Sequence, residues 1–175
     1  TVSTTDSQIL LSSIDENVLE SGEGSFTELA GNITAEQSSY TLTKDYVYTN
    51  DDADYVNGIV IDKDFTINGD GKSICGNDVA RIFNVTGGTL TLNNVTLCHG
   101  NASEGAGVYV GSGAALDASD VVFSENVAVD NGGAIFTDDG TITLTDCVLD
   151  SNDVTKLESS ASENRGGAAI YAKDA

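Results

Sequence analysis

The sequence predicts an all-β fold, a single-stranded parallel β-helix of about five coils with three strands per coil and an N-terminal capping helix. Two observations predict it. From Tyr40 onward, apolar residues alternate with Thr, Ser and Asp, as they do in half-buried strands. In addition, a phrase of three strand-like runs recurs after roughly 23 to 27 residues, with one longer gap before the last copy, and such a period is typical of solenoids.

The clearest copy of this phrase covers residues 132–137, 141–145 and 147–152. Aligning all copies gives three columns of equivalent runs. The first column holds 58–61, 81–85, 107–110, 133–136 and 167–171; the second holds 40–42, 65–67, 90–92, 116–118 and 142–144; the third contains Val47, Ile74, Val95 with Leu97, Val121 with Phe123, and Cys147 with Leu149. We expect each run to pair in parallel with its equivalent in the next coil, about 4.8 Å further along the axis.

The chain is predicted to divide into an N-terminal extension, residues 1–24, and the parallel β-helix, residues 25–175. The extension is polar, with small apolar islands at 9–11 and 18–19. It is either a linker or a strand that docks along the body or onto a neighbouring subunit.

Ser25 and Glu28 have the spacing of a capping box and predict that a short helix begins here. Phe26, Leu29 and Ile33 fall on one face of that helix, so it should cover the core of the first coil.

Two polar segments, 50–57 and 153–164, are predicted to loop out of the stack. Asn126 and Asn152 occupy equivalent corners, where they form either a hydrogen-bonded ladder or two independent turns. The last coil has no predicted cap. We therefore expect either a longer solenoid or a second molecule stacked end to end, which would propagate a filament.

The three cysteines are predicted to differ in environment. Cys75 and Cys98 follow the inward residues Ile74 and Leu97, so they should point outward on neighbouring coils, either as a disulfide or as two stacked thiols. Cys147 aligns with buried positions and is predicted to be a small buried hydrophobic residue.

These repeats resemble the adhesin-like surface proteins of methanogenic archaea, and also the polymorphic outer-membrane and pectate-lyase-like β-helix families. The resemblance covers about residues 25 to 172 and is clearest at 40–46, 58–63, 65–71, 80–85 and 132–136. It implies a secreted or wall-attached protein used in attachment, and, together with the usual crossover rule, a right-handed coil. It transfers no catalytic residue.

The charge of the chain limits its partners. With 28 Asp and Glu against 7 Lys and Arg, the net charge is -21, which argues against binding to nucleic acid or to anionic lipid. No apolar run approaches the ~20 residues of a membrane span. We expect an extracellular or cell-surface location, with self-association through the solenoid ends or the N-terminal strand, and cell-surface or glycan ligands. Glycosylation sequons at Asn32, Asn84, Asn94 and Asn101 are compatible with this location.

The sequence favours a non-enzymatic structural protein; a carbohydrate-binding or polysaccharide-active β-helix is the alternative. Glycoside hydrolysis needs paired carboxylates, and no compact acidic pair stands out across adjacent coils. Arg81 and Arg165 lie far apart along the axis, and His99 is interpreted as a turn residue rather than a catalyst.

No cofactor is expected; a specific Ca²⁺ site is the alternative to a solvated acidic loop, which the sequence favours. The weak candidate ligands of such a Ca²⁺ site are Asp51, Asp52 and Asp54, which alternate partly like oxygen ligands but lack any known calcium-binding motif.

Overall fold

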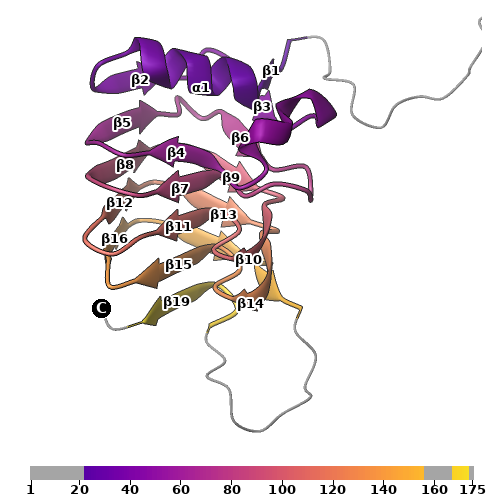
Figure 1. Cartoon of the computed structure of the whole chain (residues 1–175), viewed down its shortest axis with the longest axis vertical. Coiled ribbons are helices and arrows are strands. Elements are labelled where there is room, and N and C mark those ends of the chain that lie inside the picture. The colour runs from indigo at the N-terminus through magenta and orange to yellow at the C-terminus, as the bar shows by residue number, and fades with distance from the viewer. Residues whose placement is uncertain (1–21, 156–166, 174–175) are drawn as a thin grey trace, which may run out of the picture.

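The computed structural model describes residues 22–155 and 167–173. Short strands stack coil upon coil, with a helix lying across the N-terminal end (Figure 1). Every strand pair is parallel, and equivalent strands of successive coils are neighbours in each sheet. The predicted parallel β-helix is therefore confirmed.

The strands form three long sheets. The first contains β4 (Ile59–Ile61), β7 (Phe83–Val85), β11 (Val108–Val110), β15 (Ile135–Asp138) and β19 (Ile170–Lys173). The second contains β2 (Ser39–Thr41), β5 (Phe65–Asn68), β8 (Thr89–Asn93), β12 (Ala115–Ser119) and β16 (Thr141–Thr145). The third contains β1 (Gly24–Ser25), β3 (Tyr46–Val47), β6 (Ser73–Cys75), β9 (Thr96–Cys98), β13 (Val122–Ser124) and β17 (Val148–Asp150).

A fourth, shorter sheet was not predicted. It contains β10 (Asn101–Glu104), β14 (Val127–Asn131) and β18 (Asp153–Val154). β10 is mostly polar, and in β14 the consecutive apolar residues 127–129 precede Asp130 and Asn131, so neither strand shows the apolar alternation that marks the other three faces. The prediction that 153–164 loops out is wrong for β18, and residues 156–166 lie outside the described residues.

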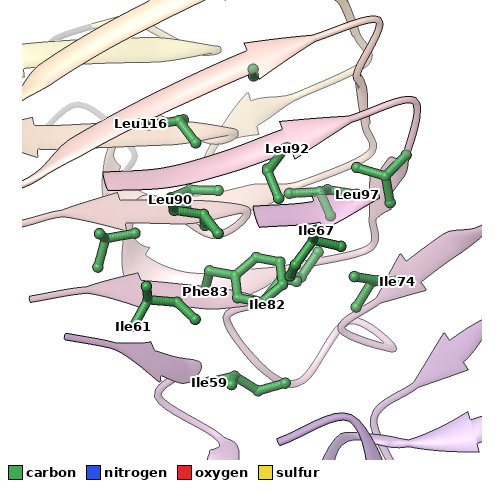
Figure 2. Packing of buried hydrophobic residues seen from close by; sticks show 14 of the residues in the cluster. Ile59, Ile61, Ile67, Ile74, Ile82, Phe83, Leu90, Leu92, Leu97 and Leu116 are labelled. Atoms are coloured by element: carbon green, nitrogen blue, oxygen red, sulfur yellow. The ribbon is translucent and has the colours of Figure 1, made fainter. Parts of the chain in front are cut away.

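The core consists of inward side chains that stack along the axis. Figure 2 shows part of it, including Ile59, Phe83 and Leu97. In the third sheet the register aligns Tyr46, Ile74, Leu97, Phe123 and Leu149. Our placement of Val47 in this inward column was wrong, because Val47 pairs with Cys75. A slip of one residue moves a side chain to the opposite face of a strand.

The capping helix α1 (Phe26–Ala35) begins where the sequence predicted. The Ser25 hydroxyl accepts a hydrogen bond from the Glu28 N–H at 3.1 Å, as an N-cap should. Phe26, Leu29, Ala30 and Ile33 are buried against the first coils. The predicted apolar face is thus confirmed.

Acidic and amide residues make many of the corners. Between the second and third sheets, Asn94, Asp120 and Asp146 have φ angles of 48°, 55° and 52°. Asn and Asp tolerate this left-handed region better than most residues. Glycine occupies other corners, for example Gly132 at φ 58°. Some of the many aspartate residues are therefore corner residues, at which the chain turns from one sheet to the next.

Candidate functional surfaces

The polar segment 50–57 contacts the N-terminus of the capping helix α1. It forms the 3-10 helix η1 (Asn50–Tyr55), from which the almost fully buried Asp52 reaches back to the start of α1. The Asp52 carboxylate accepts hydrogen bonds from the N–H groups of Phe26 and Thr27 at 3.2 and 2.8 Å, and from the Thr27 hydroxyl at 2.7 Å. The N–H and hydroxyl of Thr49 complete the set at 2.8 and 2.9 Å.

These donors decide the protonation state of Asp52. Burial alone would raise the pKa of its carboxyl group, but the hydrogen bonds from Thr27 and Thr49 outweigh burial and lower the pKa below its usual value. A carboxylate at a helix N-terminus also interacts favourably with the helix dipole. Asp52 is therefore an ionised cap shared by α1 and η1.

The residues named as weak calcium ligands thus lie in different settings. Asp52 has a capping role that the sequence did not indicate, while Asp51 and Asp54 are exposed. Within residues 22–155 and 167–173, no group of three or more His, Cys, Asp or Glu side chains is placed to hold a metal ion.

An aromatic column runs along the outer face of the first sheet. The rings of Tyr109 and Phe136 stack at 5.2 Å between centroids, and those of Phe136 and Tyr171 at 5.6 Å, with interplanar angles of 20° and 16°. The Arg81 guanidinium continues the column, 5.2 Å from the Tyr109 ring centroid. Because the ring faces cover one another, a sugar lying flat on this column would reach mainly ring edges.

Arg81 is tied to the backbone of neighbouring coils. Its guanidinium donates to the carbonyls of Gly105, Asn57 and Glu104 at 3.1, 3.1 and 2.8 Å. Burial lowers its pKa, although Tyr109 and Glu104 oppose this shift. Arg81 therefore joins the backbones of neighbouring coils by hydrogen bonds, a role that the sequence did not reveal.

His99 occupies a corner with φ 51°, consistent with its interpretation as a turn residue. Its Nδ1 lies 3.2 Å from the Asp78 carboxylate and its Nε2 lies 3.8 Å from that of Glu125. The three side chains line a shallow surface hollow of about 380 Å³ with Val127, Ser151 and Asp153. They are well exposed, so these ion pairs add little to stability.

Asn126 and Asn152 form a ladder along the axis. Asn126 is fully buried; its amide nitrogen donates to the Asn152 side-chain oxygen at 2.9 Å and to the Leu97 carbonyl at 3.0 Å. Its own side-chain oxygen accepts from the Gly100 N–H at 2.9 Å. A side chain at Gly100 would collide with the Asn126 oxygen and the Ala106 carbonyl, which explains glycine there. Of the two alternatives, the structure has the ladder.

The cysteines divide into a bonded pair and a free thiol. Cys75 and Cys98 pair across β6 and β9 and are joined by a disulfide, with their Cα atoms 4.5 Å apart. Cys147 is free and only partly buried. Our prediction of a buried Cys147 was wrong, because Cys147 directly precedes β17, and β17 is the last described strand of the third sheet.

The four sequons differ in accessibility. Asn94 is exposed at a corner. Asn101 is exposed, although its amide donates to the Asp78 carbonyl. The amide of Asn32 donates to the hydroxyls of Tyr40 and Tyr46, and Asn84 is partly buried within β7. Asn94 is the best placed of the four to carry a glycan.

A groove separates the C-terminal half of α1 from the edge strand β4. It has a volume of about 450 Å³ and is lined by Ile33, Thr34, Val60, Ile61, Asp62, Lys63 and Phe65. Lys63 stands at its rim, 5.7 Å from the Phe65 ring centroid.

Comparison with known proteins gives one match. Residues 120–138 match the Chlamydia polymorphic membrane protein repeat. No curated protein and no solved structure matches the chain. The matched residues contain β13 and β14, all of β15, and the corners between them, including the buried Asn126. The chain is therefore similar, over this stretch, to a repeat of that membrane-protein family.

No helix among the described residues combines the length and apolar character needed to cross a membrane.

Proposed function

We propose that this protein is a non-enzymatic, extracellular surface protein of the adhesin-like kind, in which a stiff β-helix displays polar faces and corners. The observation that carries the proposal is the coincidence of the matched surface-protein repeat with part of one structural coil, including the corner that holds the Asn126 ladder. The net charge of -21 argues against binding to nucleic acid. The resemblance to adhesin-like proteins of methanogenic archaea stays a prediction.

The functional test asks whether the protein binds glycans without cleaving them. The purified chain is applied to an array of glycans and polysaccharides, and the same substrates are assayed for cleavage. We expect retention on a subset of surface glycans and no release of new chain ends. Measurable cleavage would overturn the proposal.

The second candidate is a carbohydrate-binding β-helix, in which a sugar would contact the ring edges of the aromatic column of Tyr109, Phe136 and Tyr171, because the ring faces cover one another. If that column binds sugars, Tyr109→Ala should abolish glycan retention. Val60→Ala, on the same outer face but away from the stacked rings, serves as the matched control.

We also propose that the chain self-associates at the face formed by β16, β17, β18 and β19. In the described part of the chain these strands have one open edge, and Ile142, Leu144, Leu149 and Ile170 are only partly buried there. Unpaired strand edges are templates for further strands. Electron microscopy distinguishes the outcomes: end-to-end filaments are expected, and strictly monomeric particles at all concentrations would contradict self-association.

A further inference from the structure

At the helical end of the solenoid, β4 is the edge strand of the first sheet. Helix α1 packs against β1, β2, β3 and η1. Beside β4, in contrast, the groove of about 450 Å³ separates the sheet from Ile33 and Thr34 of α1. The first sheet thus has room for one more strand at this end.

The backbone of β4 is arranged to accept such a strand. In a parallel ladder, alternate residues of a strand bond to the same neighbour. The Ile59 N–H donates to the Ile82 carbonyl at 2.9 Å, and the Ile61 carbonyl accepts from the Thr86 N–H at 2.8 Å. Both residues therefore face β7, so the N–H and C=O of Val60 point toward the open edge. The Val60 side chain is 55% exposed, the most exposed of the large hydrophobic residues in the described chain.

The chain's own N-terminal segment fits this groove in composition. Residues 1–21 contain Asp6, Asp15, Glu16 and Glu20 and no Lys or Arg. The groove offers apolar surface beside Lys63, one of only 7 cationic residues against 28 acidic ones. The largest apolar island of the segment is Ile9, Leu10 and Leu11.

The number of residues between Leu11 and Gly24 also suits the distance from Gly24 to the groove. Gly24 pairs with Tyr46 at the start of α1, and the groove reaches Ile33 and Thr34 near its end. The two places are thus about one helix length, ~15 Å, apart for a helix of ten residues. A random-coil linker of ten residues, the number in 12–21, would have a root-mean-square span of about 16–19 Å. A linker whose span matches the gap gives the highest effective concentration. Residues 18–19 would reach the groove only with the chain between them and Gly24 almost fully extended, so their effective concentration there is lower.

We propose that Ile9, Leu10 and Leu11 of the chain's own N-terminal segment add to the open edge of β4 as a short strand, in the groove beside α1. This inference is independent of the proposed function, because it concerns the opposite end of the solenoid from the face proposed for self-association.

The test is hydrogen exchange of the Val60 amide in the full chain. We compare the wild type with a variant in which Ile9, Leu10 and Leu11 are all changed to Ser; the matched control carries Val18→Ser and Leu19→Ser. Exchange at Val60 should be at least tenfold faster in the first variant and unchanged in the control. Equal exchange in all three proteins would overturn the proposal. The Leu97 amide, in the core, should not change and verifies that each variant is folded.

A second set of measurements tests whether the positive charge of Lys63 contributes to docking, and whether the docked strand comes from the same chain. Lys63→Glu should speed Val60 exchange several-fold, whereas Lys72→Glu, away from the groove, should not. Protection of Val60 should be the same at all protein concentrations. Protection that appears only as concentration rises would overturn docking within the chain, because a second copy would then supply the strand.

Discussion

The two ends of the described solenoid use the same kinds of side chain in different surroundings. At the N-terminal end, α1 covers the first coils, and Tyr46 and Ile67 are fully buried. At the other end, Leu144 and Leu149 occupy the same columns but remain only partly buried. The difference teaches that a core position in this fold is buried by the coil above and the coil below, and that a coil alone buries little.

The largest expected effect compares two leucines of one column. Leu97→Ala removes a fully buried side chain and should destabilise the fold by about 2–5 kcal/mol. Leu149→Ala, two coils further on, should cost less than half as much, because its side chain is already partly exposed. Urea unfolding measures both. Equal costs would show that the last described coil is covered in solution.

The disulfide joins β6 and β9, in the half of the solenoid nearer to α1. Cys75 and Cys98 close a loop with a sequence separation of 23, for which loop entropy gives about 3 kcal/mol. Changing both residues to Ala should lower the free energy of unfolding by about this amount. Cys147→Ser is the control and should have a much smaller effect. If both changes had the same effect, the bond would not form in solution.

The Asn ladder spans the boundary between well-covered and open coils. Asn126→Ala leaves the Gly100 N–H without its acceptor in a buried site and should cost about 1–3 kcal/mol. Asn152→Ala, in the next coil and not fully buried, should cost less. Thermal unfolding of the two variants gives the comparison; a larger loss for Asn152 would contradict the burial gradient.

The helical cap depends on a charge, so its contribution should depend on pH. Asp52→Asn should cost about 1–2 kcal/mol near pH 7, whereas the exposed Asp51→Asn should be close to neutral. The lowered pKa of Asp52 means that the unfolded chain takes up this proton first as pH falls. The stability that Asp52 adds is therefore complete above its unfolded pKa of about 3.9 and is lost as pH falls through its lower folded pKa.

Unfolding of the wild type and of Asp52→Asn, measured from pH 7 to pH 2, tests this sign. The difference between the two proteins should shrink only below about pH 4. A difference that did not change with pH would mean that the Asp52 charge adds nothing to the cap.

Local patterns predicted much of this molecule. The alternation around Phe65, Leu90 and Leu116 gave the strands and their inward side, and Ser25 with Glu28 gave the start of α1. Equivalent placement of Cys75 and Cys98 predicted their proximity. Each of these signals depends on neighbours in sequence or on a regular repeat.

Other features had no local signal. Asp52 resembled any acidic loop residue until the fold placed it against Thr27, which lies 25 positions earlier. Arg81 resembled a free cation until its coil met the carbonyls of Glu104 and Gly105. The fourth sheet forms through backbone pairing of strands that have no apolar alternation, so no period-two pattern marks them in the sequence.

By itself, the sequence determined a stack of parallel coils, because the alternation of apolar residues and the period of the repeat leave few other ways to bury them. Only the tertiary structure decided which acidic residues are charged caps, which are corners and which face water. The physical reason is that the desolvation and hydrogen bonding of a carboxylate depend on groups that the fold brings close in space. Because aspartate serves in all three roles, the residue type alone does not tell them apart.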